Sequence, residues 1–299
     1  MTRRTTRFRQ LLAAPEILMM PCCHDALSAR VLEQAGFEAI AAAGFGLAGS
    51  LLGAPDIGLL DGSEMLQQYR RIAEAVQLPL FVDLDTGFGD LNNVIRAVRA
   101  AEDAGVAALF LEDQSFPKRC GHMSGKQVVP VAEYLPKLRA ALAARRDPDL
   151  VITARTDAAA VLGFDEALRR ARLYAEAGAD LVFVEALESR EQMQQANALL
   201  ASCGAASMAN QIEGGRSPLL TAAELQALGY AVVAHPCGSL FTMVRALQDW
   251  AAHLRDHGGT AGFRSRMVDF DIYLELVDLA AVRARQARLE APDEGLGPA

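Results

Sequence analysis

The clearest pattern along the chain is a repeat in which a helix-like segment ends at a glycine and a short apolar run follows. The repeat occurs at residues 31–44, 100–113, 173–186 and 225–235. Glycine after a last helical turn suits the left-handed C′ position, and an apolar run with little polar alternation is typical of a buried parallel strand. Helices and strands that alternate in this way predict a parallel sheet covered by helices.

The apolar runs of strand length number eight, which favours a (β/α)8 TIM barrel over a doubly wound sheet. Between the fifth and the sixth run, one apolar stripe of period 3.6 extends from Phe164 to Ala175 and predicts a helix. The predicted strands are Ile17–Pro21, Ala39–Ala43, Leu80–Asp85, Ala108–Glu112, Leu150–Thr156, Leu181–Glu185, Ala206–Asn210 and Ala231–His235.

Two long helical segments are expected after the eighth strand, at Leu240–His257 and Arg264–Arg288. The tail at 290–299 is rich in Gly and Pro and is expected to fray. Because no change of composition marks a second domain, we expect one barrel domain over residues 1–299, with extra C-terminal helices at 240–288.

Composition and charge narrow the range of partners. The chain has 299 residues, is 52% hydrophobic and carries a net charge of −8, which argues against nucleic acid or an anionic membrane as a partner. No apolar stretch approaches the roughly 20 residues that a membrane span needs. The Arg- and Thr-rich N-terminus resembles a transit peptide in composition, but we interpret it as the face of a first helix.

The five cysteines, at 22, 23, 120, 203 and 237, are odd in number and have no framework spacing. We therefore expect reduced thiols and a cytoplasmic protein. The run Cys22-Cys23-His24 lacks further soft ligands at zinc spacing, so we interpret it as packing at the end of the first strand.

Polar residues stand at the carboxyl ends of the predicted strands, where a barrel carries its chemistry. Asp83 and Asp85 are two residues apart and can share the inner face, and Glu112 ends the next strand. Carboxylates crowded at one rim repel one another unless a cation neutralises them, and hard oxygen donors suit Mg²⁺ or Mn²⁺. The alternative is that some of these acids cap helices or pair with Arg155. The other strand ends carry Arg155, Asp157, Glu185, Asn210 and His235.

The fourth strand leads into a loop with reactive side chains, Lys118, Arg119, Cys120 and His122, and with glycines at 121 and 125. Cationic neighbours favour the thiolate form of a cysteine, and exposure would allow it to exchange a proton with a substrate. Cys-x-His is also a fragment of zinc sites, but the remaining ligands are missing.

The segment 44–49 matches the G-x-G-x-x-G pattern directly after a strand. A dinucleotide fingerprint must then open a helix, whereas Gly53, Pro55 and Gly58 break this segment, and we expect a loop that contains Asp56. Backbone N–H groups there could hold a substrate carboxylate instead.

Six blocks of the sequence resemble the isocitrate lyase/phosphoenolpyruvate mutase superfamily, in particular its short lyases, the 2-methylisocitrate lyases, 2,3-dimethylmalate lyases and carboxyphosphonoenolpyruvate mutases. The blocks are PCCHDALSARVLEQAGF, GAPDIGLL, VDLDTGFGD, LEDQSFPKRCGH, ITARTDA and ANQIEGG, within residues 8 to 250. The K-R-C-G-H block, joined to D-x-D-T-G-F-G, is the most specific of these motifs.

The resemblance implies a metal site and a set of substrate contacts. Asp85 would bind Mg²⁺ directly, Asp83 and Glu112 would support it partly through water, and Asp56 would lie near metal and substrate. Arg155 would be the cationic clamp for a carboxylate. The remaining substrate contacts would come from Ala43, Gly44, Phe45, Asp83, Glu185, Asn210, Glu213 and His235.

The resemblance also implies a gating loop at residues 115–130, which we call the flap, and an assembly. The flap would close and bring Lys118, Cys120 and His122 over the ligand, a small carboxylate. Cys120 would then act as the general acid that protonates a carbanion. Relatives typically form homotetramers in which dimer partners exchange C-terminal helices.

The chain departs from its relatives around the substrate. No tyrosine, serine or threonine precedes Gly44, His235-Pro236 stands where tyrosine-proline is common, and Cys22, Cys23 and His24 replace small and aromatic residues. We therefore expect the reaction class to be kept and the substrate to differ from 2-methylisocitrate.

The leading hypothesis is a Mg²⁺-dependent carbon–carbon lyase that releases a 2-oxo acid such as pyruvate from a branched 2-hydroxy di- or tricarboxylate. The alternatives are a phosphonomutase or phosphonopyruvate hydrolase, and an oxaloacetate decarboxylase or hydrolase, which His235 motivates. A non-catalytic binding protein would predict a broken set of metal ligands, and no acid is missing.

Overall fold

The computed structural model describes residues 2–290, so the predicted tail beyond Glu290 lies outside the described residues. The chain divides into two compact units, one up to Thr242 and one from Met243 onward. The first unit contains all eight strands, and the second consists of helical segments. Within the described residues no helix is both long enough and apolar enough to cross a membrane.

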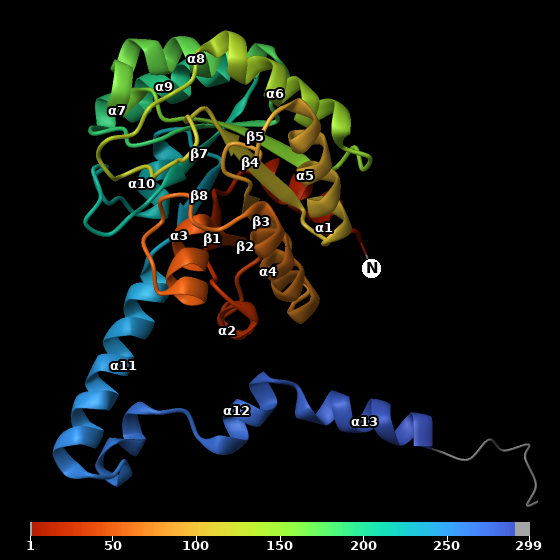
Figure 1. Ribbon diagram of the computed structural model, residues 1–299, viewed down its shortest axis with the longest axis vertical. Coiled ribbons are helices and arrows are strands. Elements are labelled where there is room, and N and C mark those ends of the chain that lie inside the picture. The colour runs from red at the N-terminus through yellow and green to blue at the C-terminus, as the bar shows by residue number, and fades with distance from the viewer. Residues whose placement is uncertain (1, 291–299) are drawn as a thin grey trace, which may run out of the picture. The chain divides into compact units, whose positions relative to one another are not determined.

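Eight parallel strands form the sheet of the first unit, in the order β1-β8-β7-β6-β5-β4-β3-β2 (Figure 1). The ends of the sheet meet where Cys22 forms a parallel bridge with Ala41, and this contact closes the barrel. The (β/α)8 prediction is thus confirmed, and each strand begins and ends within two residues of its expected bounds. The strands are β1 Leu18–Pro21, β2 Ile40–Ala42, β3 Leu80–Asp83, β4 Ala108–Glu112, β5 Val151–Thr156, β6 Leu181–Val184, β7 Ala206–Asn210 and β8 Val232–His235.

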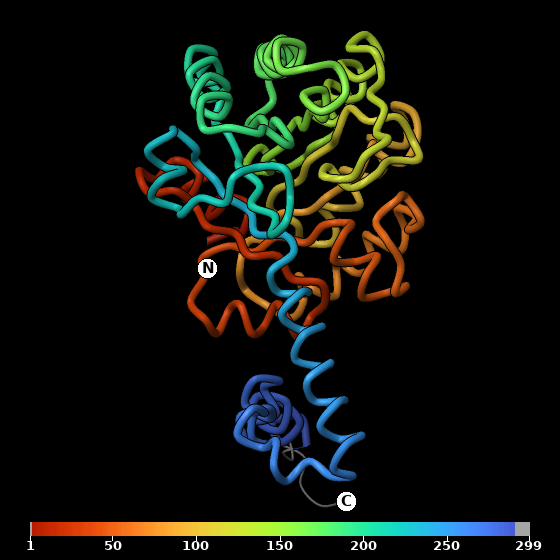
Figure 2. Tube along the Cα trace, turned by 90° about the vertical axis from the view of Figure 1, so that its left-hand side faces the viewer, coloured from red at the N-terminus to blue at the C-terminus, as the bar shows by residue number. Residues whose placement is uncertain are grey.

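Helices of the first unit surround the strands in both views of the molecule (Figure 1, Figure 2). Several begin at a capping box: Asp25 with Ser28 at α2, and Asp61 with Glu64 at α4. The helices are α1 Arg4–Leu12, α2 Ala26–Gln34, α3 Gly44–Leu47, the π-helix η1 Ala48–Leu52, α4 Gly62–Ala75, α5 Leu91–Asp103, α6 Val131–Ala144, α7 Ala159–Leu162, α8 Phe164–Glu176, α9 Arg190–Ser202, α10 Ala222–Ala227 and the start of α11 Gly238–His257.

Alternate residues of each strand enter two different cores. Phe81, Phe110 and Phe183 fill the interior of the barrel, whereas their strand neighbours pack outward against the helices. Side chains two positions further along each strand share the inward face, so the strand ends direct their polar residues into the barrel mouth.

Two predictions about helices need correction. The segment after β2 does open a helix, because α3 and η1 continue to Leu52 before Gly53 adopts the left-handed conformation that ends them. The predicted second C-terminal helix is broken into η2 Ala261–Arg266, α12 Phe270–Leu276 and α13 Leu279–Glu290. Asp278 between the last two has a φ of 59°, which an α-helix does not allow.

The N-terminal segment is a helix, as expected. Arg4 donates to the carbonyl of Ala73 at 2.8 Å, and Arg9 donates to Asp180 at 2.8 Å. These basic side chains therefore hold α1 against the end of α4 and the loop before β6.

Candidate active site

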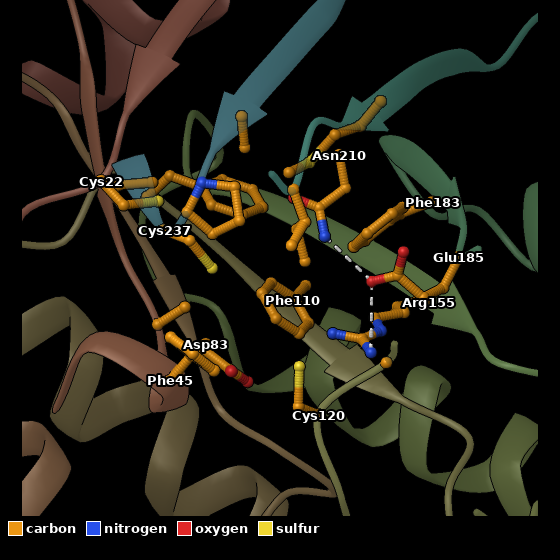
Figure 3. A pocket seen from close by; sticks show the side chains of 18 of the residues that line it. Cys22, Phe45, Asp83, Phe110, Cys120, Arg155, Phe183, Glu185, Asn210 and Cys237 are labelled. Carbon is orange, nitrogen blue, oxygen red and sulfur yellow. Dashed lines mark hydrogen bonds and ion pairs between the residues drawn. The ribbon is translucent and has the colours of Figure 1, made fainter. Parts of the chain in front are cut away.

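A cavity of about 50 Å³ lies at the carboxyl ends of the strands (Figure 3). Such a volume holds a few water molecules. Most of the lining is apolar, and the polar groups are few and close together, as in many ligand sites. The predicted site residues that line the cavity are Ala43, Phe45, Asp56, Asp83, Cys120, Arg155, Glu185 and Asn210.

Two acids of the D-L-D segment are buried at the end of β3. Asp83 accepts the backbone N–H of Gly44 at 3.2 Å and that of Asp85 at 2.7 Å, so it ties the β2 and β3 loops together. Asp85 has a φ of 47°, an uncommon conformation for a residue other than glycine. Burial raises the pKa of Asp85 to about 7, and nearby Lys118 opposes this shift without cancelling it.

The ammonium group of Lys118 reaches from the flap into this acidic group. It lies 2.7 Å from Asp56 and 2.8 Å from Asp85. Burial on its own would lower the pKa of Lys118, but Asp85, Asp83 and Asp56 outweigh it and raise that pKa well above its usual value. The flap therefore supplies a cation to the acids that the sequence predicts as metal ligands.

Glu112, at the end of β4, is the least satisfied of the buried acids. Its side chain is about 1% exposed, neither carboxylate oxygen has a hydrogen-bond partner, and the nearest cation is Arg155 at 3.3 Å. Burial raises the pKa of Glu112 well above its usual value, against the opposing effect of Arg155. A buried acid without hydrogen bonds is costly, and this favours a further ligand such as a cation or its water.

Arg155, at the end of β5, is held among acids and aromatic rings. It donates to Asp157 through Nε at 2.9 Å and Nη2 at 3.1 Å, and Nη2 lies 3.4 Å from Glu185. Its guanidinium stands over the rings of Phe110 and Phe183, 5.5 and 5.2 Å from their centroids. These contacts fix the direction of the fork toward the cavity.

Glu185 connects three elements of the site. It accepts from Asn210 at 3.0 Å and contacts Arg155, as the dashed lines of Figure 3 show. Burial works to raise the pKa of Glu185, but Arg155 and His122 outweigh it and lower that pKa to about 2. Because His122 Nδ1 accepts the N–H of Arg216 at 2.8 Å, its Nε2 donates to Glu185 at 3.0 Å.

The flap lies closed on this group. Cys120 donates its backbone N–H to Asp56 at 3.0 Å, and its side chain points into the cavity (Figure 3). The expectation of a thiolate is wrong: burial raises the pKa of Cys120 to about 11, and Asp56 and Glu185 add to the shift. The neighbouring cations have little effect because Lys118 pairs with acids and Arg119 is exposed.

Glycine at position 121 is required by a close approach. A Cβ there would lie 2.4 Å from Arg155 Nη2 and 2.6 Å from Glu185 Oε2. The flap backbone therefore rests directly on the charged pair at the ends of β5 and β6.

Three predicted substrate contacts, Gly44, Glu213 and His235, do not line the cavity. Glu213 is exposed in the loop after β7, and His235 is half-buried at the end of β8. Burial lowers the pKa of His235, with Glu213 as an opposing charge. The metal-site residues Asp85 and Glu112, the flap residues Lys118 and His122, and Gly44 lie around the cavity without lining it.

Sequence reasoning missed several residues of the site. Cys22 is not merely packing at the end of β1, because it lines the cavity together with Cys237, which follows β8 (Figure 3). Burial raises the pKa of both thiols, so they act as small apolar groups. The pairing of β1 with β8 could have suggested this contact, since Pro21 is in register with His235.

No preformed metal cluster is present: in residues 2–290 no three His, Cys, Asp or Glu side chains are arranged to hold an ion. The donor set itself fits Mg²⁺, because all the donors are carboxylate oxygens and the oxygens of Glu112 have no hydrogen-bond partner. In the closed flap, Lys118 provides the positive charge next to Asp85.

Comparisons with known proteins agree with this geometry. Residues 8–255 match the family described as phosphoenolpyruvate phosphomutase. The chain belongs to the isocitrate lyase/phosphoenolpyruvate mutase superfamily. It is 42% identical to the 2,3-dimethylmalate lyase of Eubacterium barkeri, over 93% of this chain and 95% of that protein. It is 36% identical to the 2-methylisocitrate lyase of Bacillus subtilis, over 96% of this chain and 95% of that protein.

Solved structures of the superfamily share the fold. Oxaloacetate acetylhydrolase in complex with 3,3-difluorooxalacetate matches with a TM-score of 0.90 and 34% identity, over 97% of this chain and 99% of that one. Phosphonopyruvate hydrolase in complex with oxalate and Mg²⁺ matches with a TM-score of 0.85 and 32% identity, over 96% of this chain and 99% of that one. The proteins that this chain is similar to therefore differ in the reactions that their names give.

Proposed function

We propose that this protein is a Mg²⁺-dependent carbon–carbon lyase. It cleaves a branched 2-hydroxy di- or tricarboxylate, similar to 2,3-dimethylmalate or 2-methylisocitrate, into a 2-oxo acid such as pyruvate and a second carboxylate. One observation carries the proposal: a protonated thiol, Cys120, lines the same small cavity as Asp83 and Arg155. The similarity to lyases over nearly the whole chain supports it.

Substrate binding uses the charged groups of the cavity. Arg155 binds a carboxylate, and the backbone at Ala43, Gly44 and Phe45 holds the carboxylate of the pyruvate-like part. Asp85 would bind Mg²⁺, with Asp83 and Glu112 in support, and the ion would supply positive charge that stabilises a developing oxyanion.

The reaction needs one proton removed and one delivered. Loss of the substrate's hydroxyl proton turns the carbinol carbon into the carbonyl of the 2-oxo acid. The adjacent carbon–carbon bond breaks, and its electron pair stays on the carbon beside the second carboxylate. Cys120 donates its proton to that carbanion, and its raised pKa supports this role because the thiol keeps its proton at neutral pH. The closed flap excludes water meanwhile.

The other flap residues have supporting roles. Lys118 neutralises Asp56 and Asp85 and stabilises negative charge near the metal site. His122 holds Glu185, which in turn orients Asn210 toward the rest of the substrate. Asp56 anchors the backbone of Cys120 and so places the thiol over the cavity.

A second candidate is hydrolysis of oxaloacetate, which the 34% identity to oxaloacetate acetylhydrolase over 97% of this chain supports. Hydrolysis requires a held and activated water beside the substrate. The apolar wall formed by Cys22, Cys237 and Pro236 offers such a water few partners, so we rank the lyase first.

The assembly is a homotetramer built from dimers that exchange C-terminal helices. Apolar side chains that a lone copy leaves exposed on the second unit support this proposal, since large apolar patches mark interfaces. The most exposed of them are Leu247, Met267, Val268, Phe270, Ile272 and Leu289.

A panel assay tests the activity. Purified protein with Mg²⁺ is incubated with 2,3-dimethylmalate, 2-methylisocitrate, oxaloacetate and phosphonopyruvate, and products are followed by 2-oxo acid detection and phosphorus NMR. We expect pyruvate from at least one branched 2-hydroxy acid. Phosphate release or rearrangement at phosphorus, without carbon–carbon cleavage, would eliminate the lyase.

A further inference from the structure

Lys126 is a buried lysine of the flap for which the proposed chemistry has no use. Its side chain is only 2% exposed, and it does not line the cavity. Its ammonium donates to the carbonyl oxygen of Gly121, on the same flap, and to Asp157 Oδ1 at 2.7 Å. A strongly hydrated group is buried here only because both partners hold it.

Asp157, which receives this contact, also lies behind the guanidinium of Arg155. Its Oδ2 accepts from Arg155 Nε at 2.9 Å, and its Oδ1 accepts from Nη2 at 3.1 Å. Its backbone N–H donates to the fully buried carboxylate of Asp113 at 2.9 Å, so the acid cannot shift without disturbing the core. One carboxylate thus holds the flap on one side and Arg155 on the other.

We propose that Lys126 and Asp157 are positioning residues that latch the flap shut and couple its closure to the orientation of Arg155. The contact runs from the Gly121 carbonyl through Lys126 to Asp157 and on to the guanidinium. The inference rests on the proposed function only in taking Arg155 as the clamp for a substrate carboxylate.

Charge and packing explain why the two motions are linked. Asp157, Glu185 and Glu112 surround Arg155, and Lys126 offsets part of this negative charge. When the flap opens, Lys126 leaves and Asp157 keeps a single cationic partner. Gly121 leaves as well, and the close backbone contact that confines Arg155 Nη2 is lost. Closure of the flap therefore restricts the orientation of the Arg155 guanidinium.

The first test measures hydrogen exchange of the flap in Lys126→Met, without substrate. The amide of Cys120 donates to the backbone carbonyl of Asp56, which lies outside the flap, so its exchange reports opening of the flap. We expect hydrogen exchange in peptides from residues 115–128 to become about tenfold faster or more. The reason is that the carbonyl of Gly121 and the carboxylate of Asp157 both lose the ammonium group that holds them. Lys137→Met on α6, which removes a lysine outside the flap and the cavity, should match the wild type.

The second test measures binding of oxalate in the presence of Mg²⁺ by calorimetry. Lys126→Met should weaken the binding of oxalate by several-fold, although Lys126 does not line the cavity. Asp157→Asn should weaken the binding of oxalate further. Exchange in β5 and α8 peptides should stay at the wild-type rate in both variants, which separates a latch from general unfolding.

Two results would overturn the inference. If hydrogen exchange of the flap is unchanged in Lys126→Met, Lys126 does not hold the flap closed. If exchange becomes faster but the affinity for oxalate is unchanged, flap closure is not coupled to the orientation of Arg155. Neither measurement needs turnover, so a failure of the proposed lyase activity would be recognised separately.

Discussion

The ammonium nitrogen of Lys118 lies 2.8 Å from a carboxylate oxygen of Asp85. The flap thus brings its own cation to the acid that we propose as the Mg²⁺ ligand. Two cations that share one acid repel each other, so the lysine cannot strengthen the binding of the metal.

Lys118→Met should therefore separate catalysis from metal binding. We expect turnover to fall by about 100-fold or more, since a preorganised cation near the reacting oxygens is removed. The affinity for Mg²⁺, measured by calorimetry without substrate, should be no weaker than in the wild type. Weaker Mg²⁺ binding would contradict the proposed arrangement.

Asp85→Asn tests the metal site directly. The amide keeps the size of the side chain but removes the charge, so we expect activity to lose its dependence on Mg²⁺ and to fall by about 100-fold or more. Asp165→Asn, on the exposed start of α8, is the matched control and should behave as the wild type. An Asp85→Asn enzyme with an unaltered Mg²⁺ titration would exclude this residue as a ligand.

The protonation of Cys120 predicts its reactivity. With a pKa of about 11, the thiol is neutral at pH 7 and becomes the reactive thiolate only as the pH rises toward that value. Alkylation of Cys120 by iodoacetamide, followed by peptide mass spectrometry, should be slow at pH 7 and still accelerate between pH 9 and 10. A rate that is already constant below pH 8 would show that the thiolate is the resting form.

Gly121→Ala tests closure of the flap. The added methyl would meet Arg155 Nη2 at 2.4 Å and Glu185 Oε2 at 2.6 Å, so the flap cannot seat without moving both. We expect kcat to fall by about tenfold or more, because the thiol is no longer held over the cavity. Gly259→Ala, where a Cβ meets nothing within 4 Å, is the control. Full activity of Gly121→Ala would mean that the closed flap is not the reactive form.

The strands and most of the cavity could be predicted from sequence because both follow from short-range rules. Side chains alternate along a parallel strand with a period of two residues, and this alternation points Asp83, Glu185 and Asn210 inward at the strand ends. The rule does not apply to Glu213, which lies in a loop, and it places His235 on the same outward face of β8 as Val233, so neither residue lines the cavity.

What the sequence could not provide are contacts between distant segments. The thiolate expectation for Cys120 counted its neighbours along the chain, but burial is the main cause that raises the pKa of this thiol, and the acids that add to the shift, Asp56 and Glu185, lie far away in sequence. Lys126 and Asp157 are 31 positions apart, and nothing local indicates that they touch. The break at Asp278 depends on a single left-handed residue inside a helical pattern.

The most direct measurement of the central claim is product analysis in D₂O. Enzyme and Mg²⁺ are incubated with 2,3-dimethylmalate or 2-methylisocitrate, and products are followed by proton and carbon NMR for the wild type and for Cys120→Ser. We predict pyruvate and a second carboxylate that carries one deuterium at the carbon that kept the electron pair of the broken bond. Cys120→Ser should lose most turnover and still bind oxalate. No carbon–carbon cleavage of either acid, or full turnover in Cys120→Ser, would contradict the account.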